Sequence, residues 1–155
     1  MRRIMGRWVA ALAGIVMALG LVVMSVSPAQ AAYRLQIHRI YYNSPGPDHG
    51  SNSSLNAEWV QLHNTSGSKI SLKGWTVRDT AGHVFTFKGY TIKAHGYVKI
   101  HTGTGSGTQT DRYWDRSWYV WNNNGDTATL RDSHGNRIDR CSYNDPSELF
   151  SYKTC

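Results

Sequence analysis

The sequence predicts an all-β domain arranged as an antiparallel sandwich or barrel, and two observations lead to this fold class. Beyond residue 32, apolar and polar residues alternate in short segments rich in β-branched and aromatic side chains, and no segment of ten or more residues repeats with a helical period. Clusters of Gly, Ser, Asn and Asp, such as DTAGH, NNNGD and DSHGN, separate these segments. Short strands joined by such turns are typical of sandwiches and barrels.

The individual strands follow from this alternation. They are expected over residues 34–42, 57–64, 69–80, 83–88, 91–102, 127–132 and 136–143. In the segment 57–64 the register stays open, because Trp59 and Val60 are adjacent and both apolar. The residues expected to face the core are Leu35, Ile37, Trp59, Val60, Leu62, Leu72, Trp75, Val77, Phe85, Phe87, Val98, Ile100, Ala128, Leu130 and Ile138.

The segment 117–143 poses a choice between a metal site and a turn. Asp126, Asp132 and Asp139 are suggestively spaced, but a calcium loop needs oxygen ligands at alternate positions, a Gly at the sixth and an acid at the twelfth. That pattern fails whether it starts from Asp126 or from Asp132. Gly135 belongs to the sequence DSHGN, which is typical of a tight turn and separates two segments of alternating polarity. We therefore expect a β-hairpin here and no metal site.

The first 31 residues have the organisation of a secretory signal peptide. A basic start is followed by an uncharged stretch over residues 8–24, and Ala29-Gln30-Ala31 forms a small-residue cleavage site. An uncleaved membrane anchor is the alternative, since about 20 apolar residues span a bilayer. We expect cleavage after Ala31, export from the cell, and one mature domain over residues 32–155 with no membrane span.

Cleavage would lower the positive charge of the protein. The full chain carries 17 Lys plus Arg against 10 Asp plus Glu, a formal net charge of +7, and three of the arginines belong to the signal peptide. The mature chain would therefore have 14 basic against 10 acidic residues, a net charge of +4. This charge favours acidic partners such as nucleic acid, anionic wall polymers or lipid headgroups. The basic residues arrive singly along the sequence, which indicates a solvated surface.

The two cysteines of the chain, Cys141 and Cys155, both fall in the exported part. An even number of cysteines in an exported chain is typical of a disulfide. Closing a loop of about 15 residues contributes roughly 3 kcal/mol in the chain-entropy model. We expect this bond to hold the C-terminal tail, which is a structural role.

Several motifs, in a consistent order, resemble the lamin tail domain. They are E-W-V-x-L-x-N at 58–64, L-x-G-W-x-x-x-D at 72–79, the pair Phe85 and Phe87, T-G-x-G at 102–105, and V-W-N-N-x-G-D-x-A-x-L at 120–130. The resemblance extends over about residues 35–143, and this domain also occurs in secreted bacterial proteins. It implies an immunoglobulin-like antiparallel β-sandwich that binds or tethers partners, with no catalytic machinery and no cofactor.

Other residues could carry chemistry of their own. The seven histidines are dispersed, whereas zinc sites need clustered ligands, so no metal site is expected. His49, Asp48 and Glu58 could approach one another around one loop and form an acid–base pair, but PGPD and GSNSS in that loop are ordinary turn sequences. The glycine-rich stretch 102–108 lacks the helix and the GK[ST] ending of a phosphate-binding loop, and we expect a mobile loop there.

An aromatic and basic cluster is the candidate ligand-binding site. Aromatic rings interleaved with arginine suit stacking on sugars or on unpaired bases. Trp121 is expected in the core because it belongs to the 120–130 motif, whereas for Trp114 burial and exposure are equally consistent with the sequence. The candidate ligand-binding residues are Arg112, Tyr113, Trp114, Arg116 and Trp118.

These observations predict a secreted, non-catalytic binding or scaffold module. The expected partner is a cell-wall polysaccharide or an extracellular protein. A small secreted hydrolase or nuclease, with chemistry around His49 and His101, is one alternative. An extracellular module that binds DNA through its charge is another, and it ranks lower because the bases are scattered.

Overall fold

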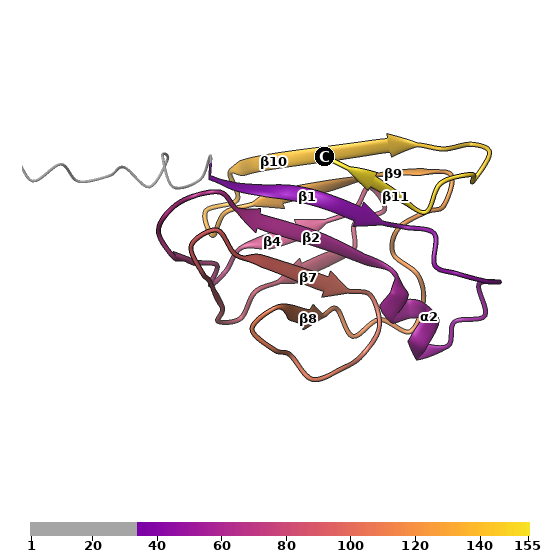
Figure 1. The fold of residues 1–155 in the computed structure, drawn as a ribbon, viewed down its shortest axis with the longest axis horizontal. Coiled ribbons are helices and arrows are strands. Elements are labelled where there is room, and N and C mark those ends of the chain that lie inside the picture. Colours follow the sequence, from indigo (N-terminus) through magenta and orange to yellow (C-terminus); the bar gives the residue numbers. More distant parts are fainter. Residues whose placement is uncertain (1–33) are drawn as a thin grey trace, which may run out of the picture.

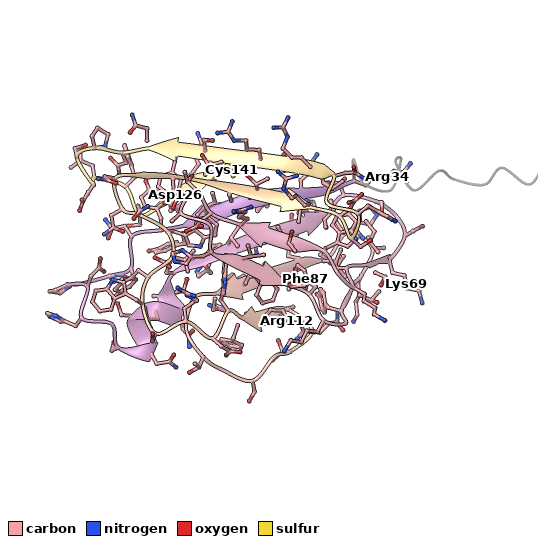
Figure 2. All side chains as sticks on the ribbon, turned by 180° about the vertical axis from the view of Figure 1, so that it is seen from behind. Arg34, Lys69, Phe87, Arg112, Asp126 and Cys141 are labelled. Atoms are coloured by element: carbon pink, nitrogen blue, oxygen red, sulfur yellow. A yellow bond between two sulfur atoms is a disulfide. The ribbon has the colours of Figure 1, made fainter. Side chains whose placement is uncertain are left out.

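The computed structural model describes residues 34–155, so the predicted signal peptide over residues 1–31 lies outside the described residues. Two β-sheets stack into a sandwich with one short helix at one end (Figure 1). Arg34 and Lys69 lie at one end of the sandwich, and Asp126 lies at the other, where the helix is found (Figure 2). The predicted immunoglobulin-like β-sandwich is confirmed.

The first sheet has five strands in the order β11-β1-β2-β7-β8 (Figure 1). Its members are β1 (Leu35–Tyr41), β2 (Trp59–Asn64), β7 (Tyr97–His101), β8 (Asp111–Tyr113) and β11 (Tyr152–Thr154). Neighbouring strands run antiparallel except β7 and β8, which are parallel. The sheet therefore joins the N-terminal strand, the middle of the chain and its C-terminal end.

The second sheet has four strands in the order β10-β9-β4-β5. Its members are β4 (Thr76–Arg78), β5 (Val84–Thr86), β9 (Gly125–Arg131) and β10 (Arg137–Asn144). The hairpin expected in the segment 117–143 is confirmed, because β9 and β10 pair antiparallel across the turn that contains Gly135. Two further short strands, β3 (Ile70–Ser71) and β6 (Thr91–Ile92), pair with each other.

Alternation along the strands places one face of each sheet in a shared core. On β2, Val60 and Leu62 are fully buried, and on β9 Ala128 and Leu130 are fully buried as well. Phe87, labelled in Figure 2, belongs to this core. Its exposed fraction is 1%. Most of the residues expected to face inward are buried.

Three of these residues are only half-buried, which corrects the expected core. Trp59 lies on the outer face of β2, because its neighbour Val60 takes the inward position, and this resolves the register that the sequence left open. Phe85 and Ile138 pack against the edge of the core without being enclosed by it. Ile138 falls at a register shift between β10 and β9, where the ladder is irregular.

Two long predicted strands are broken by turns, and one helix was not predicted. Gly74, with a φ of +80°, separates β3 from β4, and His95, with a φ of 52°, lies between β6 and β7. Before β2, the helix α2 (Asn52–Ala57) begins at Ser51, whose Oγ accepts a hydrogen bond from the Ser54 amide. A six-residue helix is too short to show a helical period.

The C-terminal tail is held by both pairing and a covalent bond. Cys141 on β10 and Cys155 form a disulfide, as expected from their number. The strand β11 pairs with β1, and the Cys155 amide donates to the carbonyl of His38. Within the described part of the chain, no helix is long and apolar enough to cross a membrane.

Candidate functional site

The structure separates the residues that the sequence placed in one aromatic site. Trp114 is 9% exposed and packs edge-on against Phe85 and Trp121, each with a ring-centroid distance of 5.9 Å. Trp121 is 1% exposed, as expected for a core residue. Trp114 is therefore a core residue, and its inclusion among the ligand-binding candidates was wrong. Adjacent apolar residues cannot be assigned to core or solvent from spacing alone in an irregular segment.

Arg112 and Tyr113 lie away from Trp118, at the open edge between β5 and β8. They line a hollow of about 210 Å³ together with Phe85 and Lys88. The guanidinium of Arg112 lies 4.3 Å from the centre of the Tyr90 ring and donates to the carbonyl of Thr108, so this side chain is already engaged. Arg116 is half-buried and lines neither this hollow nor the one beside Trp118.

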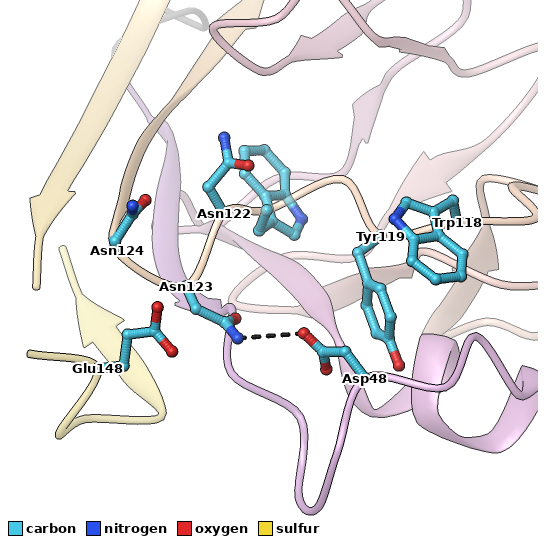
Figure 3. Close-up of a pocket in the computed structure, with 8 residues that line it drawn as sticks. Asp48, Trp118, Tyr119, Asn122, Asn123, Asn124 and Glu148 are labelled. Atoms are coloured by element: carbon cyan, nitrogen blue, oxygen red, sulfur yellow. Dashed lines mark hydrogen bonds between the residues drawn. The ribbon is translucent and has the colours of Figure 1, made fainter. Parts of the chain in front are cut away.

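Trp118 stands beside a second hollow of about 320 Å³ at the end of the sandwich where α2 lies (Figure 3). The indole is 59% exposed, which is unusual for a tryptophan in a folded domain. Polar side chains make up most of the wall. The hollow is lined by Asp48, Trp118, Tyr119, Trp121, Asn122, Asn123, Asn124 and Glu148.

Local contacts hold Trp118 in this position. Its ring lies directly against Gly50, where an added Cβ would come within 2.8 Å of Cζ3. The neighbouring Tyr119 is fixed by its hydroxyl, which lies 2.6 Å from Ser54 Oγ on α2 and accepts from the Gly50 amide. The exposed ring thus lies against the loop before α2 and, at a ring-centroid distance of 5.5 Å, against Tyr119, which α2 holds in place.

The polar wall is also pre-positioned by hydrogen bonds. Asn123 Nδ2 donates to Asp48 Oδ2 at 3.2 Å, which joins two segments 75 residues apart in the chain (Figure 3). Asn122 Nδ2 donates to Asp126 Oδ2. The main-chain carbonyl of Asn124 accepts from the Asp145 amide, which fixes the backbone at this position. The remaining amide and carboxylate groups of Asp48, Asn123 and Glu148 face a space that is large enough for a small polar ligand.

The three aspartates that raised the question of a metal loop have structural roles. Asp126 accepts from the amides of Thr80 and Thr127. Asp132 closes the β9–β10 turn, and Asp139 accepts from the Ile37 amide at 2.7 Å and so links the two sheets. Among residues 34–155 no group of three or more His, Cys, Asp or Glu side chains is arranged to hold a metal ion.

Glu58 is the most perturbed carboxyl group of the domain. It is fully buried, accepts a hydrogen bond from Thr102 Oγ1 at 2.5 Å, and accepts another from the Val120 amide at 2.8 Å. Burial raises its pKa to about 7; hydrogen bonds from Thr102 and from the amides of Val120 and Trp121 oppose this rise, and the charge of Asp48 adds to it. The carboxyl group ties the start of β2 to the segment that enters β9.

The acid–base set considered around His49 is not assembled. His49 is exposed, while Glu58 is enclosed and held by Thr102 and Val120. His101, the other histidine considered, has one ring nitrogen 2.7 Å from the Asn56 carbonyl and the other 3.0 Å from Asp111 Oδ1. Both of its nitrogens are therefore occupied by contacts within the domain.

The glycine-rich stretch 102–108 is fastened to α2, which differs from the mobile loop expected. Asn52 and Asn56 both donate to the carbonyl of Thr104, and Asn52 Oδ1 accepts from the Thr104 amide. An added Cβ at Gly103 would lie 2.5 Å from Asn52 Oδ1, so this glycine permits the close approach. The sequence did not show these contacts because the helix itself was not expected.

The Trp118 hollow combines a supported aromatic ring with amide and carboxylate groups, an arrangement suited to sugars. An indole stacks on the apolar C–H face of a sugar ring, while Asn amides can donate to and accept from its hydroxyls and carboxylates can accept from them. Asp48, Asn123 and Glu148 were not among the ligand-binding residues expected from the sequence. They come from three segments that are distant in the chain. Only Asn123 belongs to a sequence pattern noted above, NNNGD, and that pattern indicated a turn.

Comparison with known proteins identifies one family. The family model described as Lamin Tail Domain matches residues 28–145, which is most of the chain. No curated protein matches the chain.

Proposed function

Because the chain belongs to the lamin tail domain family, an immunoglobulin-like family whose members are generally non-catalytic, we propose that it is a binding module whose ligand is a sugar chain held in the Trp118 hollow. The observation that carries this proposal is the 59% exposed indole supported beside a polar hollow. A large exposed ring that is held in place presents apolar surface to a ligand at little entropic cost.

The charge of the hollow narrows the class of sugar. Asp48 and Glu148 both line it and both are exposed, and no Lys or Arg is among the lining residues. An acidic wall disfavours uronic acids and other anionic sugars through like-charge repulsion. We therefore expect a neutral or amino-bearing sugar, such as the hexosamines of a wall polysaccharide.

The proposal includes the location and the lack of turnover. A signal-peptide-like leader and the pair Cys141 and Cys155 support an extracellular module. The perturbed carboxyl of Glu58 is enclosed, and its bonds to Thr102 and Val120 give it a structural role, which supports binding without catalysis. The alternative ligand is an extracellular protein whose polar surface would fit the same hollow.

The test is co-sedimentation of the protein with purified cell-wall sacculi and with insoluble polysaccharides, followed by titration with soluble oligosaccharides. Tryptophan fluorescence reports the titration directly, because a bound sugar would cover the exposed indole. Trp118→Ala is the informative variant, and we expect it to weaken binding by about 5-fold to 150-fold, since a lost aromatic stack costs on the order of 1–3 kcal/mol. Gly50→Ala should also weaken binding, because its Cβ would displace the ring.

Tyr152→Ala is the matched control, since this ring is 49% exposed but lies on β11, away from the hollow. Its binding should equal that of the unaltered protein. Retention that persists in Trp118→Ala, or no retention on any polysaccharide, would overturn the proposal and direct the search to a protein ligand.

A further inference from the structure

Four arginines from three strands, one on β4 and three on the β9–β10 hairpin, share the outer face of the four-stranded sheet. Arg137 pairs with Arg131, and Arg131 pairs with Thr76, so these side chains point to the same side. Arg140 pairs with Thr129, which in turn pairs with Arg78. Val77 and Leu130, between these positions, point into the core.

The spacing of this face follows from strand geometry. Strands lie about 4.8 Å apart, so Arg131 and Arg137 are neighbours, whereas Arg78 and Arg140 are roughly 10 Å apart across β9. The two rows are separated by roughly 7 Å along a strand. Arg78, Arg137 and Arg140 are exposed, and Arg131 is half-buried with one N–H donated to the Gly135 carbonyl.

No carboxylate neutralises these arginines. In the described part of the chain, no Lys or Arg nitrogen lies within 4.0 Å of a carboxylate oxygen, and the ion pairs present all involve histidine. The acids are occupied elsewhere: Asp79 accepts from the amides of Gly82 and His83, and Asp145 accepts from the Phe150 amide. The basic side chains are therefore unpaired, and it is the pairing of β4 with β9 that brings Arg78 to the arginines of the hairpin.

The chemistry of the face favours phosphate as the anionic group. The guanidinium fork matches two oxygens of one phosphate, and the hydroxyls that share this face can add further hydrogen bonds. These hydroxyls belong to Thr76, Thr86, Thr127, Thr129 and Ser142. The face has no aromatic ring on which a base could stack. It can therefore bind a ligand only through charge and hydrogen bonds.

We propose that the outer face of the β10-β9-β4-β5 sheet is a second binding site, which holds a linear polymer of phosphodiester-linked polyols through Arg78, Arg131, Arg137 and Arg140. Trp118 lies in the segment between β8 and β9, outside this sheet, so the arginine face does not depend on the sugar site. This ligand is favoured by charge complementarity, because the unpaired arginines attract the regularly repeated phosphates of the polymer.

Defined poly(glycerol phosphate) fragments, titrated into the protein at 50 and 200 mM salt, test this site. If four charges are neutralised, the logarithm of affinity should fall with the logarithm of salt at a slope of about −2.8, which is an affinity loss of about 50-fold over this range. The double variant Arg78→Gln/Arg140→Gln should bind more weakly than the unaltered protein at both salt concentrations. With two charges left, its slope should be about −1.4, so its affinity should fall only about 7-fold between 50 and 200 mM salt.

Lys69→Gln/Lys93→Gln is the matched control, because it removes two exposed charges from residues outside the four-stranded sheet. It should retain the affinity and slope of the unaltered protein, as should Trp118→Ala. If both double variants lose the same affinity for poly(glycerol phosphate), the net charge of the protein alone determines binding, and the proposed site is wrong. Equal affinity for a polyuronate of the same charge would overturn the preference for phosphate, and tighter binding of a thymidine oligonucleotide would replace the polyol polymer with nucleic acid.

Discussion

Replacing Glu58 with glutamine should remove a pH dependence of stability that this carboxyl group creates. The pKa of Glu58 is raised from 4.5 to about 7 in the folded domain, chiefly because burial disfavours the charged form. Between these values the folded protein keeps a proton that the unfolded chain has already released. Folding therefore becomes less favourable as pH rises through this window, and the contribution is lost above about pH 7.

The magnitude follows from the same two values. At about 1.36 kcal/mol per pH unit, a rise from 4.5 to about 7 corresponds to about 3 kcal/mol of unfolding free energy between about pH 5 and pH 8. The amide of Glu58→Gln would resemble the protonated acid, because its oxygen can still accept from Thr102 Oγ1 and the Val120 amide. We expect the variant to match the unaltered protein within about 1 kcal/mol at about pH 5 and to be more stable by up to about 3 kcal/mol at about pH 8.

Urea unfolding at several pH values from about 5 to 8, followed by tryptophan fluorescence, measures this difference. Burial lowers the pKa of His63, and this gives an opposite slope in the same window, but it is common to both proteins and cancels in the comparison. Glu148→Gln makes the same chemical change at an exposed position and should leave the slope unaltered. Parallel stability curves for Glu58→Gln and the unaltered protein would refute the reasoning.

Two further predictions concern the core and the tail. Trp114→Ala should destabilise the fold by about 3–5 kcal/mol, because it empties a core position. Trp118→Ala should change the free energy of unfolding by about 0.5 kcal/mol or less, because its ring is exposed. Similar values for the two variants in urea unfolding would contradict this placement of the two residues. Replacing Cys141 and Cys155 with serine should cost about 3 kcal/mol. It should also increase hydrogen exchange of the amide at position 155, which donates to His38, and unchanged protection there would show that strand pairing alone holds the tail.

The hairpin and the sequence-derived core show where alternation is a sufficient guide. Residues such as Leu62, Val98 and Leu130 are apolar at every second position of a strand, so one face can be buried in only one register. Segments without a regular period were less predictable. The helix α2 is too short to show one, and the edge strands β8 and β11 are three residues each. The positions of α2 and β11 depend on partners that are distant in the chain, namely Thr104 for the helix and β1 for the strand.

The sequence by itself was enough to determine an all-β sandwich, the family of the domain and the pairing of its two cysteines, because periodicity, motif order and an even cysteine number are properties of the linear chain. Only the tertiary structure decided which aromatic residue is exposed and which basic residues meet. Trp114 and Trp118 are four positions apart in an irregular segment, and their environments differ because one faces Phe85 and the other Gly50. The arginines of β4, β9 and β10 form one face because β4 pairs with β9, a strand distant in the chain, and no local pattern encodes which strands become neighbours.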